Sequence, residues 1–235
     1  MMRQNTKKQT RGHKNAREES AMRTNPFSDT FLFLIGSTPD HQGSGIGLLL
    51  VLLFWALMMA TVFIAPRNWL ADPAQHTFEH VATWVMRVMI GCMWFQGSLW
   101  KLPLPVSGGL KFWVLQEGNY AAFTIHKWIA TNVFVPALDS IVFLTELLLA
   151  VSFMLGFFVR PMAVIGILYT LQLWLGLYQD PSEWPWEYMF LIFTMGFFYV
   201  CRAGMSLGLD AWLARQPFGP FKEHGSLATI YRRLA

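Results

Sequence analysis

An arginine lies inside a stretch that otherwise has the composition of a membrane span. Arg87 falls in the apolar stretch 81–100, which also holds Gln96, and Glu146 falls in a later apolar stretch. An ionised side chain at the centre of a bilayer costs roughly 2.5 to 3.5 kcal/mol on insertion scales, so such groups usually face other helices and pair. The chain is therefore expected to fold as a helical bundle with a polar interior.

Composition independently predicts an integral membrane protein. Hydrophobic residues make up 54% of the 235 residues and charged residues only 14%, whereas charged residues reach about 25% in soluble domains. Several Trp lie at the ends of apolar stretches, where an amphipathic ring favours the headgroup layer. The sequence has no Gly-rich phosphate loop, nucleophile elbow or HExxH motif. These features exclude a soluble catalytic domain.

Five stretches reach the length of about 20 mostly apolar residues that a helix needs to cross a bilayer. They are 46–65, 81–100, 137–158, 161–178 and 184–201. The predicted fold class is all-α: a polytopic membrane protein with several transmembrane helices, in the bacterial cytoplasmic (inner) membrane. The third and fourth stretches are joined so tightly, at 159–161, that they must be antiparallel neighbours.

Three segments flank or interrupt the spans. Residues 1–44 form a polar, basic tail that is expected to be irregular, and residues 214–235 form a second basic tail. Residues 102–136 interleave aromatic and charged side chains, which fits either an amphipathic segment in the membrane interface or a folded extramembrane cap. The basic residues close to the spans are evenly divided between the two sides, so orientation stays open.

One face of the helix predicted over 81–100 collects polar and small residues at intervals of three and four. They are Arg87, Gly91, Trp94, Ser98 and Lys101. Gln96 lies nearly opposite, so protein is expected on more than one side of this helix. Glu146 and Gln172 fall near the middle of their spans, and Arg87 is expected to reach Glu146. The pair would either fix helix register or line a site for a headgroup, ion or proton, with Glu146 handling the proton.

No haem, flavin or metal site is evident from the sequence. All six histidines lie outside the predicted spans, so a bis-histidine haem between these helices is not expected. His76 and His80 are spaced for one helix face, which suits either two metal ligands or the interfacial start of a helix. Cys92 and Cys201 form no CxxC pattern and are read as buried structural thiols.

Three pieces of the chain resemble the DoxX/DoxD family of small membrane proteins. They are RVMIGCMWFQGSLWKLP at 87–103, LTELLLAVSFMLGFFVRPMAVIG at 144–166 and WPWEYMFLIFTMGFFYVCRAGMSLGLDAWL at 184–213. The resemblance implies a four-helix bundle over 81–213, to which the helix at 45–66 is an addition. It also implies a relation to the small subunit of thiosulfate:quinone oxidoreductase. By position, the family's marked residues correspond to Lys101, Glu146, Arg160 and Asp210.

The expected function is that of an integral membrane subunit of a quinone-linked oxidoreductase, which anchors a redox partner and lines a quinone site. Glu146 and Arg87 are the candidate catalytic residues. The candidate quinone- or headgroup-binding residues are Arg87, Trp94, Gln96, Lys101, Glu146 and Gln172. The alternative is a non-catalytic accessory subunit of a larger respiratory or photosynthetic complex, and a small transporter ranks last. Expected partners are membrane lipids and other subunits, with no nucleic acid.

Overall fold

The described part of the chain is built from helices. The computed structural model describes residues 25–37, 48–102, 104, 114, 118–125, 127–128, 136–181, 183–216 and 231, and no strand occurs among them. The long helices are α3 (Leu48–Ala71), α4 (Phe78–Leu99), α7 (Pro136–Leu155), α8 (Val159–Leu177) and α9 (Pro185–Val200). The short ones are α2 (Pro26–Leu34), η2 (Pro73–Gln75), η3 (Ala203–Met205) and α10 (Leu209–Ala214). Each predicted span thus overlaps one long helix, and the all-α prediction is confirmed for these residues.

Two of the helices are long and apolar enough to cross a membrane. They are α3, with 24 residues, and α8, with 19 residues. α7 and α9 contain shorter apolar stretches, Ser140–Leu155 and Trp186–Val200. Length and composition therefore support two candidate spans among the described residues, fewer than the five that the sequence predicts.

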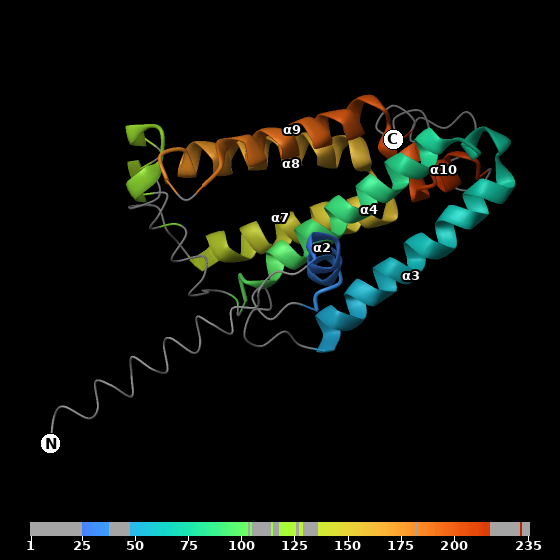
Figure 1. Cartoon of the computed structure of the whole chain (residues 1–235), viewed down its shortest axis with the longest axis horizontal. Helices are drawn as coiled ribbons and strands as arrows, with labels where there is room; N and C mark the ends of the chain where they lie inside the picture. Colours follow the sequence, from blue (N-terminus) through green and yellow to red (C-terminus); the bar gives the residue numbers. More distant parts are fainter. Residues whose placement is uncertain are drawn as a thin grey trace, which may run out of the picture.

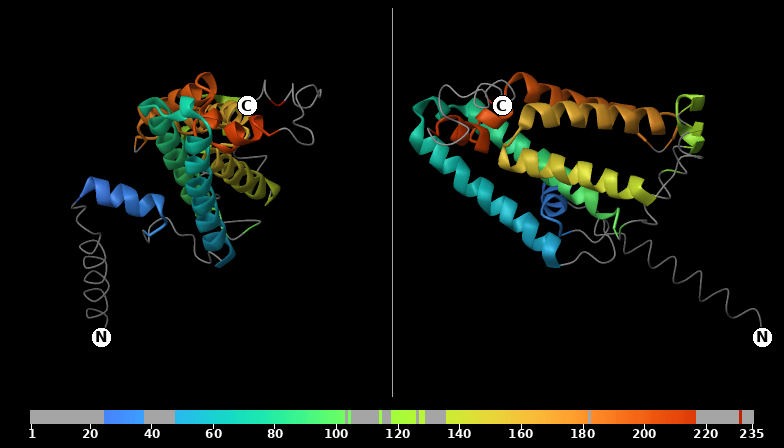
Figure 2. Two further views of the ribbon diagram at one scale, coloured as in Figure 1. Left: turned by 90° about the vertical axis from the view of Figure 1, so that its right-hand side faces the viewer. Right: turned by 180° about the vertical axis from the view of Figure 1, so that it is seen from behind.

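Four of the long helices pack as two layers, each an antiparallel pair: α4 lies against α7, and α8 lies against α9 (Figure 1). α3 runs diagonally past these layers and contacts α7 (Figures 1 and 2). Gly91 allows α4 to approach α7 closely, because a Cβ there would lie 2.7 Å from the backbone nitrogen of Met154. The fully buried core includes Phe95, Phe153 and Phe198.

α7 and α8 form the predicted hairpin, but the turn lies three residues earlier than expected. α7 ends at Leu155 and α8 begins at Val159, so Arg160 and Pro161 belong to the first turn of α8. Proline is tolerated there because the first N–H groups of a helix have no intrahelical partner. Gly156 supplies the left-handed turn, with a φ of 70°.

Two elements differ from the sequence predictions. α3 continues past the expected end at residue 65, through Pro66, and its last turn buries Asn68. The tail 1–44, expected to be irregular, contains α2, which begins with Asn25 accepting hydrogen bonds from the backbone N–H groups of Phe27 and Ser28. The sequence did not predict this helix because the tail is polar overall and the apolar residues of α2 form only one short run.

Most of the predicted interfacial segment 102–136 lies outside the described residues. Where it is described, it meets the carboxyl end of α8, because Ala122 N–H donates to the Leu175 carbonyl and Gln179 N–H donates to the Tyr120 carbonyl. Large apolar side chains here, including Phe123 and Trp128, are exposed. This position beside a helix end is compatible with both the interfacial segment and the extramembrane cap.

Candidate functional site

The structure separates the predicted polar lining into two clusters, one beside the middle of α4 and one just beyond its carboxyl end. Arg87 is near the middle of this helix and Lys101 lies just beyond its carboxyl end. They are 14 residues apart by their numbers, which is about 21 Å at 1.5 Å per residue. Both side chains are buried, at 0% and 3% exposure. The predicted face from Arg87 to Lys101 is buried throughout, but the side chains at its two ends bond to different partners.

The turn cluster consists of Arg87, Gly156, Ser206, Gly208 and Asp210. The Arg87 guanidinium donates from Nη1 to the Phe153 carbonyl (2.7 Å) and from Nη2 to the Ser206 carbonyl (3.3 Å). Phe153 is in the last turn of α7, where carbonyls lack intrahelical partners and a cation is favoured by the helix dipole. Arg87 therefore caps the carboxyl end of α7 and joins it to the segment after α9.

Glycine is required where this arginine passes the hairpin turn. The N–H groups of Gly156 and Phe157 donate to the Ser152 carbonyl, at 2.8 and 3.0 Å, as in a helix that ends with a left-handed glycine. A Cβ at Gly156 would lie 2.3 Å from Arg87 Nη1 and 2.7 Å from Gly208 Cα. The turn has no space for a side chain.

Asp210 completes the other side of the same turn. Its carboxylate accepts hydrogen bonds from the N–H groups of Phe158 (3.0 Å) and Val159 (3.4 Å), at the start of α8, and from the Tyr231 hydroxyl (2.6 Å). A negative charge at a helix amino terminus is stabilising. Burial raises the pKa of the Asp210 carboxyl, against the opposing effect of these hydrogen bonds and of the Arg87 charge. Burial likewise raises the pKa of the Tyr231 hydroxyl, and the Asp210 carboxylate adds to that effect.

Further hydrogen bonds fix the segment 203–210 against α3, η2 and α4. Asn68 Nδ2 donates to the Gly208 carbonyl (2.7 Å), Leu207 N–H donates to Gln75 Oε1 (2.9 Å), and His80 Nδ1 bonds the Ser206 hydroxyl (2.9 Å). Residues from α3, η2, α4 and the α7–α8 hairpin therefore meet the segment 203–210 at this turn. The density of bonds to backbone atoms indicates a structural junction.

The ion-pair cluster consists of Lys101, Glu146, Tyr169 and Trp94. Lys101 Nζ lies 2.6 Å from Glu146 Oε2 and donates to the Gly97 carbonyl at 2.9 Å, while the Tyr169 hydroxyl donates to Glu146 Oε1 at 2.7 Å. The expected Arg87–Glu146 pair is therefore wrong: Glu146 pairs with Lys101, because α4 and α7 are antiparallel and the carboxylate faces the far end of α4.

Trp94 belongs to this cluster by ring contact, since its ring centroid lies 5.7 Å from that of Tyr169. Its side chain is only 5% exposed, and among the described residues its indole nitrogen has no hydrogen-bond partner. A buried carboxylate that holds a lysine and a tyrosine hydroxyl can accept and release a proton without losing all its hydrogen bonds. The ion-pair cluster thus contains a candidate proton-handling group.

The remaining predicted residues lie elsewhere. Gln96 is 3% exposed on another face of α4, where its Nε2 donates to the Leu34 carbonyl of α2 at 3.4 Å. This confirms the prediction that α4 has protein on more than one side. Gln172 is exposed on α8. The structure therefore does not assemble the predicted residues into a single quinone pocket.

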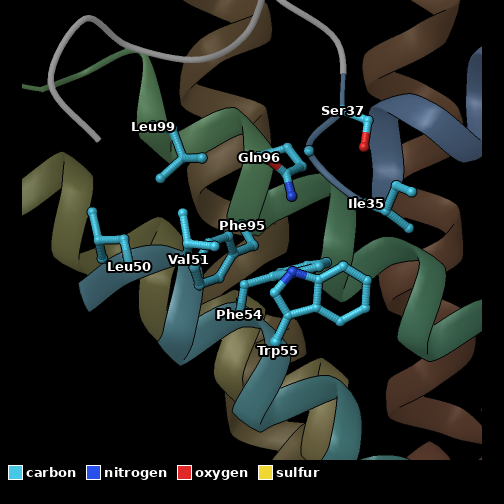
Figure 3. A pocket seen from close by; sticks show the side chains of 10 residues that line it. Ile35, Ser37, Leu50, Val51, Phe54, Trp55, Phe95, Gln96 and Leu99 are labelled. Atoms are coloured by element: carbon cyan, nitrogen blue, oxygen red, sulfur yellow. The ribbon is translucent and has the colours of Figure 1, made fainter. Parts of the chain in front are cut away.

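Gln96 instead lines a cavity of about 260 Å³ between α2, α3 and α4 (Figure 3). The walls are mainly apolar and aromatic. They are formed by Ile35, Gly36, Ser37, Leu50, Val51, Phe54, Trp55, Phe95, Gln96 and Leu99. We call this cavity the Gln96 cleft.

Sequence reasoning missed Tyr169 as the third member of the ion-pair cluster. A tyrosine in the middle of an apolar span was the available signal, because a buried phenol usually needs a hydrogen-bond partner. The histidine spacing was misleading, since His76 follows η2 and only His80 belongs to α4. Cys92 is buried as predicted, whereas Cys201 is exposed. The described residues contain no group of three or more side chains arranged to hold a metal ion.

The fold and these clusters define a class: a protein whose described residues form helices, two of them suited to crossing a membrane, and whose interior charges are bonded within the chain. Comparison with protein-family models, with curated proteins and with solved structures finds no match. The resemblance to the DoxX/DoxD family therefore stays a prediction that the three sequence pieces carry.

Proposed function

We propose that the chain is an integral membrane subunit of a quinone-linked oxidoreductase in the bacterial inner membrane. In this proposal all five long helices lie in the bilayer, as a four-helix core with α3 added. The observation that carries it is the ion-pair cluster: a carboxylate at 4% exposure, bonded to Lys101 and Tyr169 inside an apolar bundle. A buried charge is expensive in such surroundings, which favours a functional use.

The role of each part follows from where the groups lie. Reduction of a quinone consumes electrons and protons in equal number. The electrons come from the redox centre of a partner subunit, and Glu146 supplies protons that it regains from the aqueous side. Arg87 takes no part in proton transfer, because its hydrogen bonds go to backbone carbonyls at the hairpin turn. This assignment narrows the predicted catalytic pair to Glu146, with Lys101 and Tyr169 as positioning residues.

The test starts from the native assembly. The full chain is purified in mild detergent, co-purifying redox proteins are identified, and quinone reduction by the assembly is followed with the wild type and Glu146→Gln. Turnover is expected to fall at least about tenfold, as loss of a general acid or base typically costs 10²- to 10⁴-fold. Unchanged turnover with an intact assembly would remove the proposed role. Thr145→Val, on the adjacent position of α7, is the control.

A second candidate function, a non-catalytic accessory subunit, is favoured by one observation. The outward face of α3 exposes large apolar side chains, including Leu52 (57%), Met59 (51%) and Phe63 (60%). Such a face suits another membrane helix as well as lipid. If this candidate is correct, replacing these residues together with alanine releases the chain from its assembly, and Glu146→Gln leaves turnover unchanged. Removing α3 is a poorer test because Phe54 and Leu57 are buried in the core.

A further inference from the structure

The Gln96 cleft is a formed cavity that the proposed proton-handling role does not use. Its volume of about 260 Å³ lies just below the range of about 300 to 1,000 Å³ typical of ligand pockets. Phe54, Phe95 and Trp55 supply aromatic walls. Such walls suit a flat ring better than a compact polar ion.

The cleft contains a buried polar group directed at its interior. Gln96 is 3% exposed, and one of the two hydrogens on its Nε2 is used by the 3.4 Å bond to Leu34. The other hydrogen can donate to a ligand, since a side-chain amide has two donors. In Figure 3 the Gln96 amide nitrogen and the Trp55 indole nitrogen face each other across the cavity. Both sides therefore present N–H donors to an acceptor placed between them.

The turn after α2 closes one side of the cleft by a close approach to Gln96. Gly36 has a φ of 73°, and a Cβ there would lie 2.9 Å from Gln96 Oε1. α2 is held here although none of its residues is buried. The opposite side opens beside Val51 and Trp55, which are 43% and 46% exposed on α3. A ligand can thus place a polar ring inside while an apolar tail follows the outer surface of α3.

We propose that the Gln96 cleft binds the ring of a quinone, with Gln96 Nε2 donating to one ring carbonyl and Trp55 Nε1 available to the other. The choice of a quinone among flat carbonyl-bearing rings rests on the proposed function. The cleft also lies close to the ion-pair cluster along the chain, because Lys101 Nζ binds the carbonyl of Gly97, the residue after Gln96. The last turn of α4 therefore carries Gln96, which lines the ring site, and leads to Lys101, which pairs with the proton-handling Glu146 of α7.

The test measures binding to the isolated full-length chain. A short-chain benzoquinone with a decyl tail is titrated calorimetrically into the protein in lipid nanodiscs, with protein-free nanodiscs as the blank. Gln96→Leu keeps the size of the side chain and removes both N–H donors. It is expected to weaken binding about threefold to tenfold, the range for one hydrogen bond between neutral groups. Val51→Trp fills the opening and is expected to weaken binding at least about tenfold.

Matched controls distinguish binding in the cleft from the loss of a tryptophan elsewhere and from nonspecific binding of a hydrocarbon chain. Trp55→Phe removes one indole donor and is expected to weaken binding about threefold, whereas Trp186→Phe alters an equally exposed tryptophan (52%) on α9 and is expected to leave affinity unchanged. Decane titrated in the same way reports occupation by a plain hydrocarbon chain. The proposal is supported if the wild type binds the quinone more tightly than decane and if Gln96→Leu loses this preference.

Two results would overturn it. One is quinone affinity that is the same in wild type, Gln96→Leu and Val51→Trp; the other is decane binding as tight as quinone binding, which would make the cleft a lipid-chain site. Because binding is measured without the assembly, failure here leaves the turnover experiment with Glu146→Gln standing. Conversely, quinone binding in the cleft with no quinone turnover in the assembly would reject the proposed function alone.

Discussion

Arg87 in α4 and Lys101 just after that helix are both buried cations, but their partners differ in kind. Arg87 donates to two backbone carbonyls, whereas Lys101 pairs with the Glu146 carboxylate at 2.6 Å. Replacing an arginine at the turn leaves buried carbonyls without donors, and replacing one member of an ion pair leaves an uncompensated charge. The two sites are therefore expected to respond differently to paired substitutions.

Arg87→Met is expected to destabilise the folded chain by about 2 to 6 kcal/mol. The cost arises because the carbonyls of Phe153 and Ser206 lose their donor, at about 1 to 3 kcal/mol for each unsatisfied buried group. Denaturant unfolding in detergent measures the change, and Met86→Leu, an exposed neighbour, is the control. A loss below about 1 kcal/mol would show that water replaces the guanidinium at these carbonyls.

At the Lys101–Glu146 pair, the single variants Lys101→Met and Glu146→Leu are each expected to cost about 3 to 5 kcal/mol, because each leaves a buried charge unpaired. The double variant is expected to be closer to the wild type than either single one. A double-mutant cycle of unfolding free energies gives the coupling. Additive losses would contradict the pairing described above.

Asp210 makes stability depend on pH. Burial raises the pKa of this carboxyl in the folded state above its usual 3.8. The stability that the protonated carboxyl contributes is therefore fully present below pH 3.8 and is lost as the pH rises through the folded pKa. Asp210→Asn cannot ionise, so the wild-type Tm minus the variant Tm is expected to decrease from about pH 4 to pH 7. The Tm of both proteins is measured across that range. If this Tm difference instead increases with pH, the hydrogen bonds to the carboxylate lower the pKa more than burial raises it.

At the scale of elements, the hairpin between α7 and α8 depends on one glycine. Gly156→Ala would place a Cβ 2.3 Å from Arg87 Nη1 at a φ of 70°. We expect a loss of about 3 kcal/mol or more, combining left-handed strain of about 1 to 3 kcal/mol with the clash. Thermal unfolding in detergent reports it.

Gly97→Ala and Gly196→Ala are the matched controls, because nothing lies within 4 Å of a Cβ at either position. Both are in helices, where alanine is favoured over glycine by up to about 1 kcal/mol. We expect these variants to equal or exceed the wild type in Tm. If Gly156→Ala behaves like them, the turn is looser than its contacts indicate.

Most of the helices could be predicted from the sequence, because apolar runs of span length are a strong local signal. The buried face of α4 also followed from spacing, with Lys101 as its last member, and Glu146 was recognised as a charge near the middle of its span. Their pairing could not be predicted, because it depends on which ends of two antiparallel helices lie together. The bond from Asp210 to the start of α8 joins residues 51 and 52 apart, which no local pattern specifies.

At the scale of the whole molecule, exposed apolar side chains follow the long helices. Leu52 on α3 and Leu168 on α8 are 57% and 62% exposed, which is costly in water and expected in lipid. In a background without native cysteines, spin labels at Leu52→Cys and Leu168→Cys should be more accessible to oxygen than to a water-soluble nickel chelate.

A label at Glu79→Cys, in the exposed first turn of α4, should show the reverse. Three labels with the same preference for the nickel chelate would place α3 and α8 in water. That result would reject the membrane assignment itself, and with it the proposed function.

The bonds of the hairpin turn also bear on the order in which the chain is completed during synthesis. α7 and α8 leave the ribosome before Ser206 and Asp210, yet the start of α8 takes its carboxylate from Asp210 and Arg87 takes one acceptor from Ser206. A nascent chain that stops at residue 202 therefore has an arginine and a helix start without their final partners. Quality-control proteases should clear such truncated products faster than the finished protein, even though every long helix is already present.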